Sequence, residues 1–202
     1  MVLVGSIVFV SLHGEANQAS SAELEPVSAA TSAATVGAPV PSQTSSAGPQ
    51  GSPAAHGQAV DINNLLNQSE PSRGKLRHAL GQVLRCSKVS QAISSMHQVT
   101  DQRAEQLKHA KELKVDALNS GEELKLALVD ALSASYRADE AYLKWAKRYK
   151  SHRCSGPTVG DSAYDAGNVA SKDATAAKAN FVAMWNSIAQ QEGLPDRTED
   201  EI

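Results

Sequence analysis

The sequence predicts an all-α fold, an up-down-up-down four-helix bundle with a short extra N-terminal helix, preceded by a disordered linker. Two observations predict this architecture. Apolar residues recur every three or four positions in four segments between about residues 59 and 195, as on the buried face of an amphipathic helix. No part of the chain alternates apolar and polar residues for long enough to form a strand. Four such helices joined by short turns are expected to pack as a bundle.

Residues 1–13 are apolar and contain no Lys, Arg, Asp or Glu. A helix of that length reaches about 18–20 Å, whereas the hydrocarbon core of a bilayer is about 30 Å thick. We interpret the segment as an apolar anchor, either a signal peptide or a transmembrane segment whose start and basic flank lie upstream. The alternative is a buried strand or core helix.

The next segment, residues 14–58, has the composition of a disordered linker. Of its 45 residues, 32 are Ala, Ser, Thr, Pro or Gly, so it holds too little apolar surface to offset the entropy of ordering the chain. An apolar anchor followed by such a stalk is typical of bacterial domains held outside a membrane.

The bundle itself is expected to span residues 59–195. A short helix carries Val60 and Leu66 on its apolar face and closes near Pro71, which suits the first turn of a new helix. That first long helix is expected to end near Cys86.

Three further helices follow in the expected order. The second long helix starts at Ser87 or Ser90 as its N-cap and ends near Asn119. The third is expected to start with a capping box formed by Ser120 and Glu123.

The last helix is expected to begin near Asp161 or Ser162, after the breaker at 155–157. Gly193, followed by an apolar residue and a Pro, is a typical helix stop. Residues 196–202 are rich in Asp and Glu and are expected to form an acidic tail outside the bundle.

The chain contains two cysteines, Cys86 and Cys154. An up-down bundle places the ends of the first and third long helices together, so a disulfide between them is geometrically available. The alternatives are two free thiols or half of a metal site, although zinc sites normally have closely spaced Cys and His ligands. Disulfides persist in oxidising compartments, so a bridge would indicate export.

No motif for chemistry is present in the sequence. It contains no Gly-x-Ser-x-Gly, no phosphate-binding loop and no His-Glu-x-x-His. We therefore expect no catalytic residue, no metal site and no cofactor. The net charge of −3 and the lack of a strong basic field disfavour nucleic-acid binding.

Arg103 and Asp139 both fall on or beside the apolar faces of their helices, at similar distances from the turn between them. They are expected to face one another across the hairpin. The pair is either a polar binding notch or an internal ion pair with a purely structural role.

A second candidate feature is a basic end of the bundle around the two cysteines. This end would meet anionic wall polymer or lipid headgroups, or its cations would simply complement helix dipoles in solvent. Its residues are Arg85, Lys88, Lys147, Arg148, Lys150 and Arg153.

The region from about residue 59 onward is similar in style to uncharacterised exported, membrane-anchored helical proteins of actinobacterial type. This resemblance implies an envelope location and no particular activity. The residues that carry it are Ser72-Arg73, Cys86, Asp101-Gln-Arg103, Ser135, Asp139, Tyr142, Trp145, Cys154, Lys178, Phe181, Trp185-Asn186 and Arg197-Thr-Glu-Asp.

These observations together favour a non-catalytic, membrane-tethered, extracytoplasmic helical domain for binding, sensing or envelope structure. The sequence does not identify a partner; the candidates are an envelope protein and an anionic wall or membrane surface. The alternatives are the extracellular sensor part of a truncated signalling receptor and a small envelope enzyme.

Overall fold

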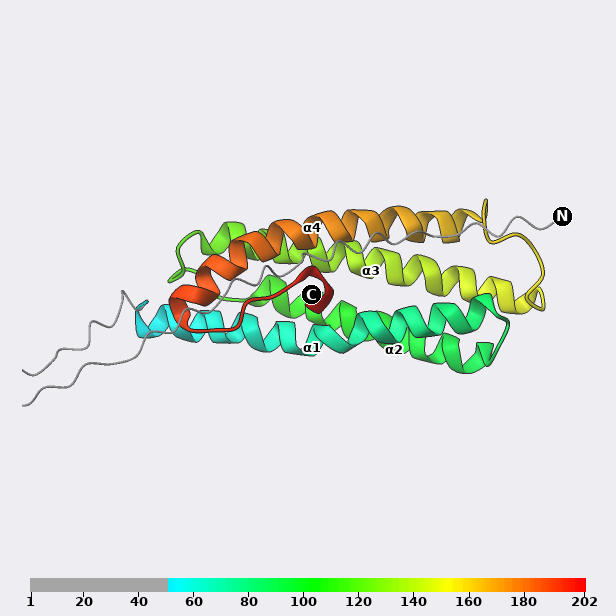
Figure 1. Cartoon of the computed structure of the whole chain (residues 1–202), viewed down its shortest axis with the longest axis horizontal. Helices are drawn as coiled ribbons and strands as arrows, with labels where there is room; N and C mark the ends of the chain where they lie inside the picture. The colour runs from blue at the N-terminus through cyan, green and yellow to red at the C-terminus, as the bar shows by residue number, and fades with distance from the viewer. Residues whose placement is uncertain (1–50) are drawn as a thin grey trace, which may run out of the picture. The chain divides into compact units, whose positions relative to one another are not determined.

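The computed structural model describes residues 51–202, in which all regular structure is helical (Figure 1). This confirms the predicted all-α class. The expected anchor, residues 1–13, and most of the expected linker lie outside the described residues. The elements are α1 (Pro53–Leu84), α2 (Val89–Glu112), α3 (Gly121–Ser151), α4 (Ser162–Glu192) and the short 3-10 helix η1 (Glu199–Glu201).

Helix α1 is one continuous helix of 32 residues. Ser52 caps it by accepting a hydrogen bond from the Ala55 N–H at 3.1 Å, and Pro53 occupies its first turn. The expected break at Pro71 was therefore wrong, and the expected linker boundary at residue 58 lies inside the helix. An interior proline removes one helix hydrogen bond and crowds the preceding turn, but buried residues of α1 on both sides of Pro71 pack into the bundle and hold the two parts of the helix together.

The starts of α2 and α3 differ from the expected caps. Lys88 and Ser120, the residues before these helices, have left-handed backbones with φ of 49° and 52°. The expected capping box at Ser120 is absent because a capping side chain requires an extended backbone at that position. Helix α2 ends at Glu112, earlier than expected.

The boundaries of α4 are as predicted. The Asp161 carboxylate accepts hydrogen bonds from the Ala163 and Tyr164 N–H groups at 2.9 and 3.2 Å. Gly193 closes the helix with φ of 68°, a conformation that favours glycine.

The C-terminal segment, residues 194–202, packs on the bundle, so the expected free acidic tail was wrong. Ile202 is fully buried and Arg197 is 7% exposed. Arg197 donates to the side chains of Asn63, at 2.7 Å, and Asn67. We call this segment the strap.

The helices form two hairpins, α1 with α2 and α3 with α4, and α2 packs against α3. Consecutive helices run in opposite directions (Figure 1). At one end, Gln58 of α1 donates to Asp116, in the loop before α3, at 2.7 Å. Helices α1 and α4 contact each other sparsely, and η1 of the strap contacts both.

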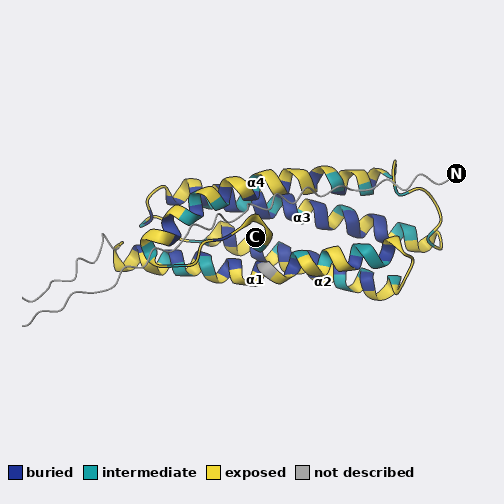
Figure 2. Ribbon diagram, in the orientation of Figure 1, coloured by how far each residue is buried: buried dark blue, intermediate teal, exposed yellow. Residues whose placement is uncertain are grey.

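Buried residues line the inward faces of all four helices (Figure 2). They form two apolar clusters, one around Leu66, Leu128 and Trp185 and one around Met96 and Trp145. Between the clusters lies a layer of buried polar side chains, which we call the polar layer. Its members are Ser69, Ser72, Arg103, Gln106, Ser135, Asp139 and Lys178.

Candidate functional site

Three charged side chains are buried at the centre of the bundle. Arg103 of α2 and Asp139 of α3 are each 2% exposed, and Lys178 of α4 is 6% exposed. The Arg103 Nε lies 3.7 Å from the Asp139 Oδ2. The predicted facing of Arg103 and Asp139 is therefore present, with a second cation beside them.

Hydrogen bonds hold Arg103 from the side of α1. Its Nη1 donates to the Ser69 Oγ at 2.7 Å, and the Ser69 hydroxyl donates to the Gln106 Oε1 at 3.2 Å. The Gln106 amide donates in turn to the Gln68 carbonyl at 2.9 Å. Among the described residues, the Arg103 Nε and the Asp139 Oδ2 have no hydrogen-bond partner.

A cavity of about 70 Å³ lies against this ion pair. Since one water takes about 30 Å³ of liquid volume, the cavity has room for two waters or one small polar group. All four helices contribute to its wall. The lining residues are Arg73, Leu76, Arg103, Ser135, Ala138, Asp139, Tyr142, Ser171, Ala174, Thr175 and Lys178.

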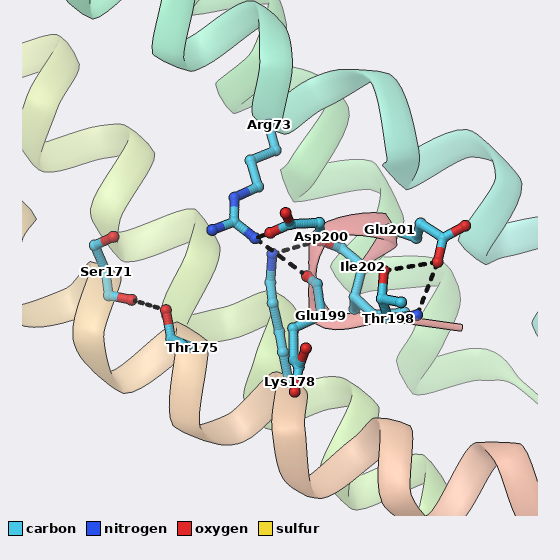
Figure 3. Close-up of polar contacts among 9 residues, drawn as sticks. All are labelled: Arg73, Ser171, Thr175, Lys178, Thr198, Glu199, Asp200, Glu201 and Ile202. Carbon is cyan, nitrogen blue, oxygen red and sulfur yellow. Dashed lines mark hydrogen bonds and ion pairs between the residues drawn. The ribbon is translucent and has the colours of Figure 1, made fainter. Parts of the chain in front are cut away.

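The strap lies beside Arg73 and Lys178, two of the cavity's cations (Figure 3). Lys178 Nζ donates to the Ile202 carbonyl oxygen. Arg73 pairs with the Asp200 carboxylate and donates to the Glu199 carbonyl at 3.4 Å. Ser171 and Thr175 of α4, which are exposed, form the outer edge of the cavity.

Burial changes the protonation of the two titratable groups in the wall. It raises the pKa of Asp139 to about 6, although Arg103 and Lys178 oppose the increase. Burial also lowers the pKa of Lys178 to about 7, with repulsion from Arg103 and Arg73 adding to the decrease. Both groups can thus change charge near neutral pH.

The predicted disulfide is present. Cys86, just after α1, is bonded to Cys154, just after α3, with their Cα atoms 5.8 Å apart. The bridge joins the two hairpins at one end of the bundle. It indicates an oxidising environment outside the cytoplasm.

The predicted basic residues surround this disulfide. Arg85, Lys88, Lys150 and Arg153 are exposed, as is Lys147. Arg148 differs, because it pairs with the Asp161 carboxylate that caps α4.

Charge is separated along the length of the bundle. The half nearer the disulfide, residues 74–100 and 137–170, contains ten Lys and Arg and four Asp and Glu. The opposite half, residues 51–73, 101–136 and 171–202, contains nine Lys and Arg and fifteen Asp and Glu. The bundle is therefore strongly dipolar.

Two further features are absent from residues 51–202. No helix in this range is both long enough and apolar enough to cross a membrane. No group of three or more His, Cys, Asp or Glu side chains in the same range is arranged to hold a metal ion.

Lys178 and the strap are the parts of the site that the sequence analysis missed. Lys178 lies four residues after Ala174 and three before Phe181, both buried on α4. This spacing places a lysine in the apolar face of the helix and was the available signal. The strap had no such signal, because its residues are mostly charged.

Comparison of the chain with models of known protein families, with curated proteins and with solved structures finds no match.

Proposed function

We propose that the chain is an extracytoplasmic, non-catalytic helical domain that binds a small polar ligand in the cavity at the polar layer. The observation that carries this proposal is the buried pair Arg103 and Asp139, which presents two unpartnered polar atoms beside a cavity. Buried polar atoms normally have partners, so a ligand or ordered water that bonds to both is favoured there.

Binding is proposed rather than catalysis because of the chemistry of the wall. Asp139 is the carboxylate among the lining residues, and it already faces Arg103. The lining residues include no histidine or cysteine that would act as a base or nucleophile.

An extracytoplasmic location is supported by the Cys86–Cys154 disulfide. Two further parts of the proposal are that the residues before α1 tether the bundle and that the chain is related to exported proteins of actinobacterial type. A sensor domain of a longer receptor would use the same cavity.

Fractionation of cells expressing the full chain, with and without residues 1–13, tests the tether. Loss of the protein from the membrane fraction in the truncated chain supports the tether, and an unchanged distribution contradicts it.

The binding role is tested by NMR on the oxidised protein. A panel of small anions, cations, zwitterions and sugars is titrated while the amide signals of Ala138 and Asp139 are followed. Saturable shifts that disappear in Asp139→Asn, a variant with nearly the same side-chain volume, support a ligand site. The ligand site is contradicted if no compound produces a shift, or if the shifts persist in the variant.

A second candidate function is favoured by the charge separation along the bundle. Because α1 starts at the acidic end, the chain enters the bundle opposite the basic disulfide end. A tethered bundle would thus present its cations away from its own membrane, which favours an anionic wall polymer over lipid headgroups as the partner.

This second role is tested by sedimentation with cell-wall sacculi and with anionic liposomes at low and physiological salt. The role is supported if the double variant Lys150→Gln with Arg153→Gln binds sacculi more weakly than the parent. The control variant, Lys111→Gln with Lys114→Gln at the opposite end, should bind as the parent does. Equal effects of both pairs, or binding to liposomes alone, would contradict it.

A further inference from the structure

The charged side chains that line the cavity do not balance. Arg103 faces Asp139, which leaves Arg73 and Lys178 without a carboxylate from the helices that line the cavity. Both cations instead contact oxygen atoms of the strap (Figure 3). Lys178 is buried, so an anion beside it is attracted more strongly than in bulk water.

We propose that the ligand of the cavity is a small oxyanion, a carboxylate or a phosphate, and that it competes with the strap for Lys178 and Arg73. This inference rests on the proposed binding function and names its ligand class. The oxygen atoms of the strap contact the same two cations that the ligand would bind.

The dimensions of the cavity fit this class. A carboxylate or phosphate group consists of three to five heavy atoms, and about 70 Å³ accommodates a group of this size. Lys178 offers three N–H donors and Arg73 a planar fork that matches two oxygens. At the outer edge, the Thr175 hydroxyl donates to the Ser171 carbonyl at 3.0 Å, so the edge is polar as well.

The strap is held at Arg197 and at the buried Ile202, so the contact of Asp200 between them can break without loss of the whole segment. Arg197 is fixed by a hydrogen bond from its backbone N–H to the Asn186 side chain at 2.8 Å. Nearer the cavity, the Asp200 side chain is 71% exposed. An exposed ion pair contributes little to stability, and an incoming anion therefore replaces Asp200 on Arg73 at low cost.

The titration of Lys178 supports the same assignment. The charged groups that face it are Arg73 of α1, Arg103 of α2 and Asp139 of α3, and burial brings its pKa to about 7. Binding of an anion favours the protonated lysine. Affinity for the anion is therefore expected to increase as the pH falls from 8 to 6.5.

Isothermal titration calorimetry of the oxidised full chain tests the proposal with phosphate, sulfate and acetate, at constant ionic strength in chloride. We expect saturable binding of at least one of these anions with a Kd of about 1 mM or lower. Lys178→Met, which keeps the length of the side chain and removes its charge, is expected to weaken binding at least tenfold. Lys172→Met, on the exposed surface of α4, is the matched control and is expected to bind as the parent does.

A second pair of variants tests competition by the strap. Asp200→Asn removes the carboxylate that pairs with Arg73 and is expected to increase affinity for the anion three- to tenfold. Asp196→Asn changes the same charge elsewhere in the strap, where the carboxylate accepts from Gln190 at 3.4 Å, and is expected to change nothing. Equal affinities for Asp200→Asn, Asp196→Asn and the parent would overturn the competition.

The outcomes separate this inference from the broader binding role. The oxyanion proposal is overturned if Lys178→Met binds the anion as tightly as the parent does. It is also overturned if no anion binds. If a neutral or cationic compound nevertheless shifts the cavity signals, the binding function stands with a different ligand. If no compound of any class does so, both proposals fail.

Discussion

Arg103 and Asp139 face one another from α2 and α3, with 3.7 Å between the Arg103 Nε and the Asp139 Oδ2 and with both side chains 3% exposed. This separation is longer than a hydrogen bond. The pair is therefore an ion pair with unused hydrogen-bonding capacity, placed where removal of either partner leaves the charge of the other buried.

Loss of one partner is expected to be far more harmful than loss of both. Arg103→Ala and Asp139→Ala should each lower the free energy of unfolding by about 3–5 kcal/mol, because each leaves an uncompensated buried charge. The double variant should lose less than the sum of the two. Urea unfolding of the four proteins measures this coupling, and strictly additive losses would contradict the pairing.

Stability should depend on pH through Lys178. Its pKa falls from 10.5 to about 7 on folding, so the unfolded chain binds more protons between these values. The contribution to stability is full above pH 10.5 and is lost as the pH falls through 7, with a slope of at most about 1.4 kcal/mol per pH unit.

This pH dependence is measured as the stability difference between the parent and Lys178→Met in urea at pH 7 to 9.5. The difference should move in favour of the parent as the pH rises, since the other titrating groups are common to both proteins. A difference that stays flat would show that Lys178 titrates normally. Asp139 should act in the opposite sense, because its raised pKa of about 6 gives a contribution that is lost as the pH rises through 6.

The Cys86–Cys154 disulfide should supply a large share of the stability. It closes a loop across 68 positions of sequence, and the chain-entropy model assigns about 4 kcal/mol to a loop of this length. Reduction of the parent and the double substitution to Ser should produce equal losses in urea unfolding. A loss below about 1 kcal/mol would mean that the reduced unfolded chain is already constrained.

Two glycines should respond in opposite directions to the same substitution. A Cβ atom at Gly167 of α4 would lie 2.6 Å from the Tyr142 Cε1 of α3, whereas nothing lies within 4 Å of a Cβ at Gly74 of α1. Gly167→Ala should cost about 1–3 kcal/mol through overpacking, and Gly74→Ala should stabilise by about 0.5–1 kcal/mol. Thermal melts check both, and a neutral Gly167→Ala would show that α3 and α4 can move apart freely.

Local signals in the sequence predicted most of the fold correctly. The Asp161 cap and the Gly193 stop depend only on neighbouring backbone groups, so they can be read from short motifs. Cys86, Cys154, Arg103 and Asp139 were predicted because helix ends and helix faces follow from periodicity. Where a boundary depends on packing, as at Pro71 and Ser120, the same motifs misled.

The strap could not be predicted, for a physical reason. Its burial rests on Ile202 and on contacts of Arg197 with Asn63 and Asn67, residues about 130 positions away. No local pattern encodes such long-range contacts. Lys178 was predictable in principle, because a lysine on an apolar face requires a partner.

The polar layer also affects how the protein unfolds. It divides the interior into two apolar cores that share few buried side chains, and the disulfide fastens only the core nearer to it. We expect the two cores to act as separate cooperative units, with slower amide hydrogen exchange around Trp145 than around Trp185. A bundle that is continuous along its helices would then open from the half that the strap covers, the same half at which the chain enters it.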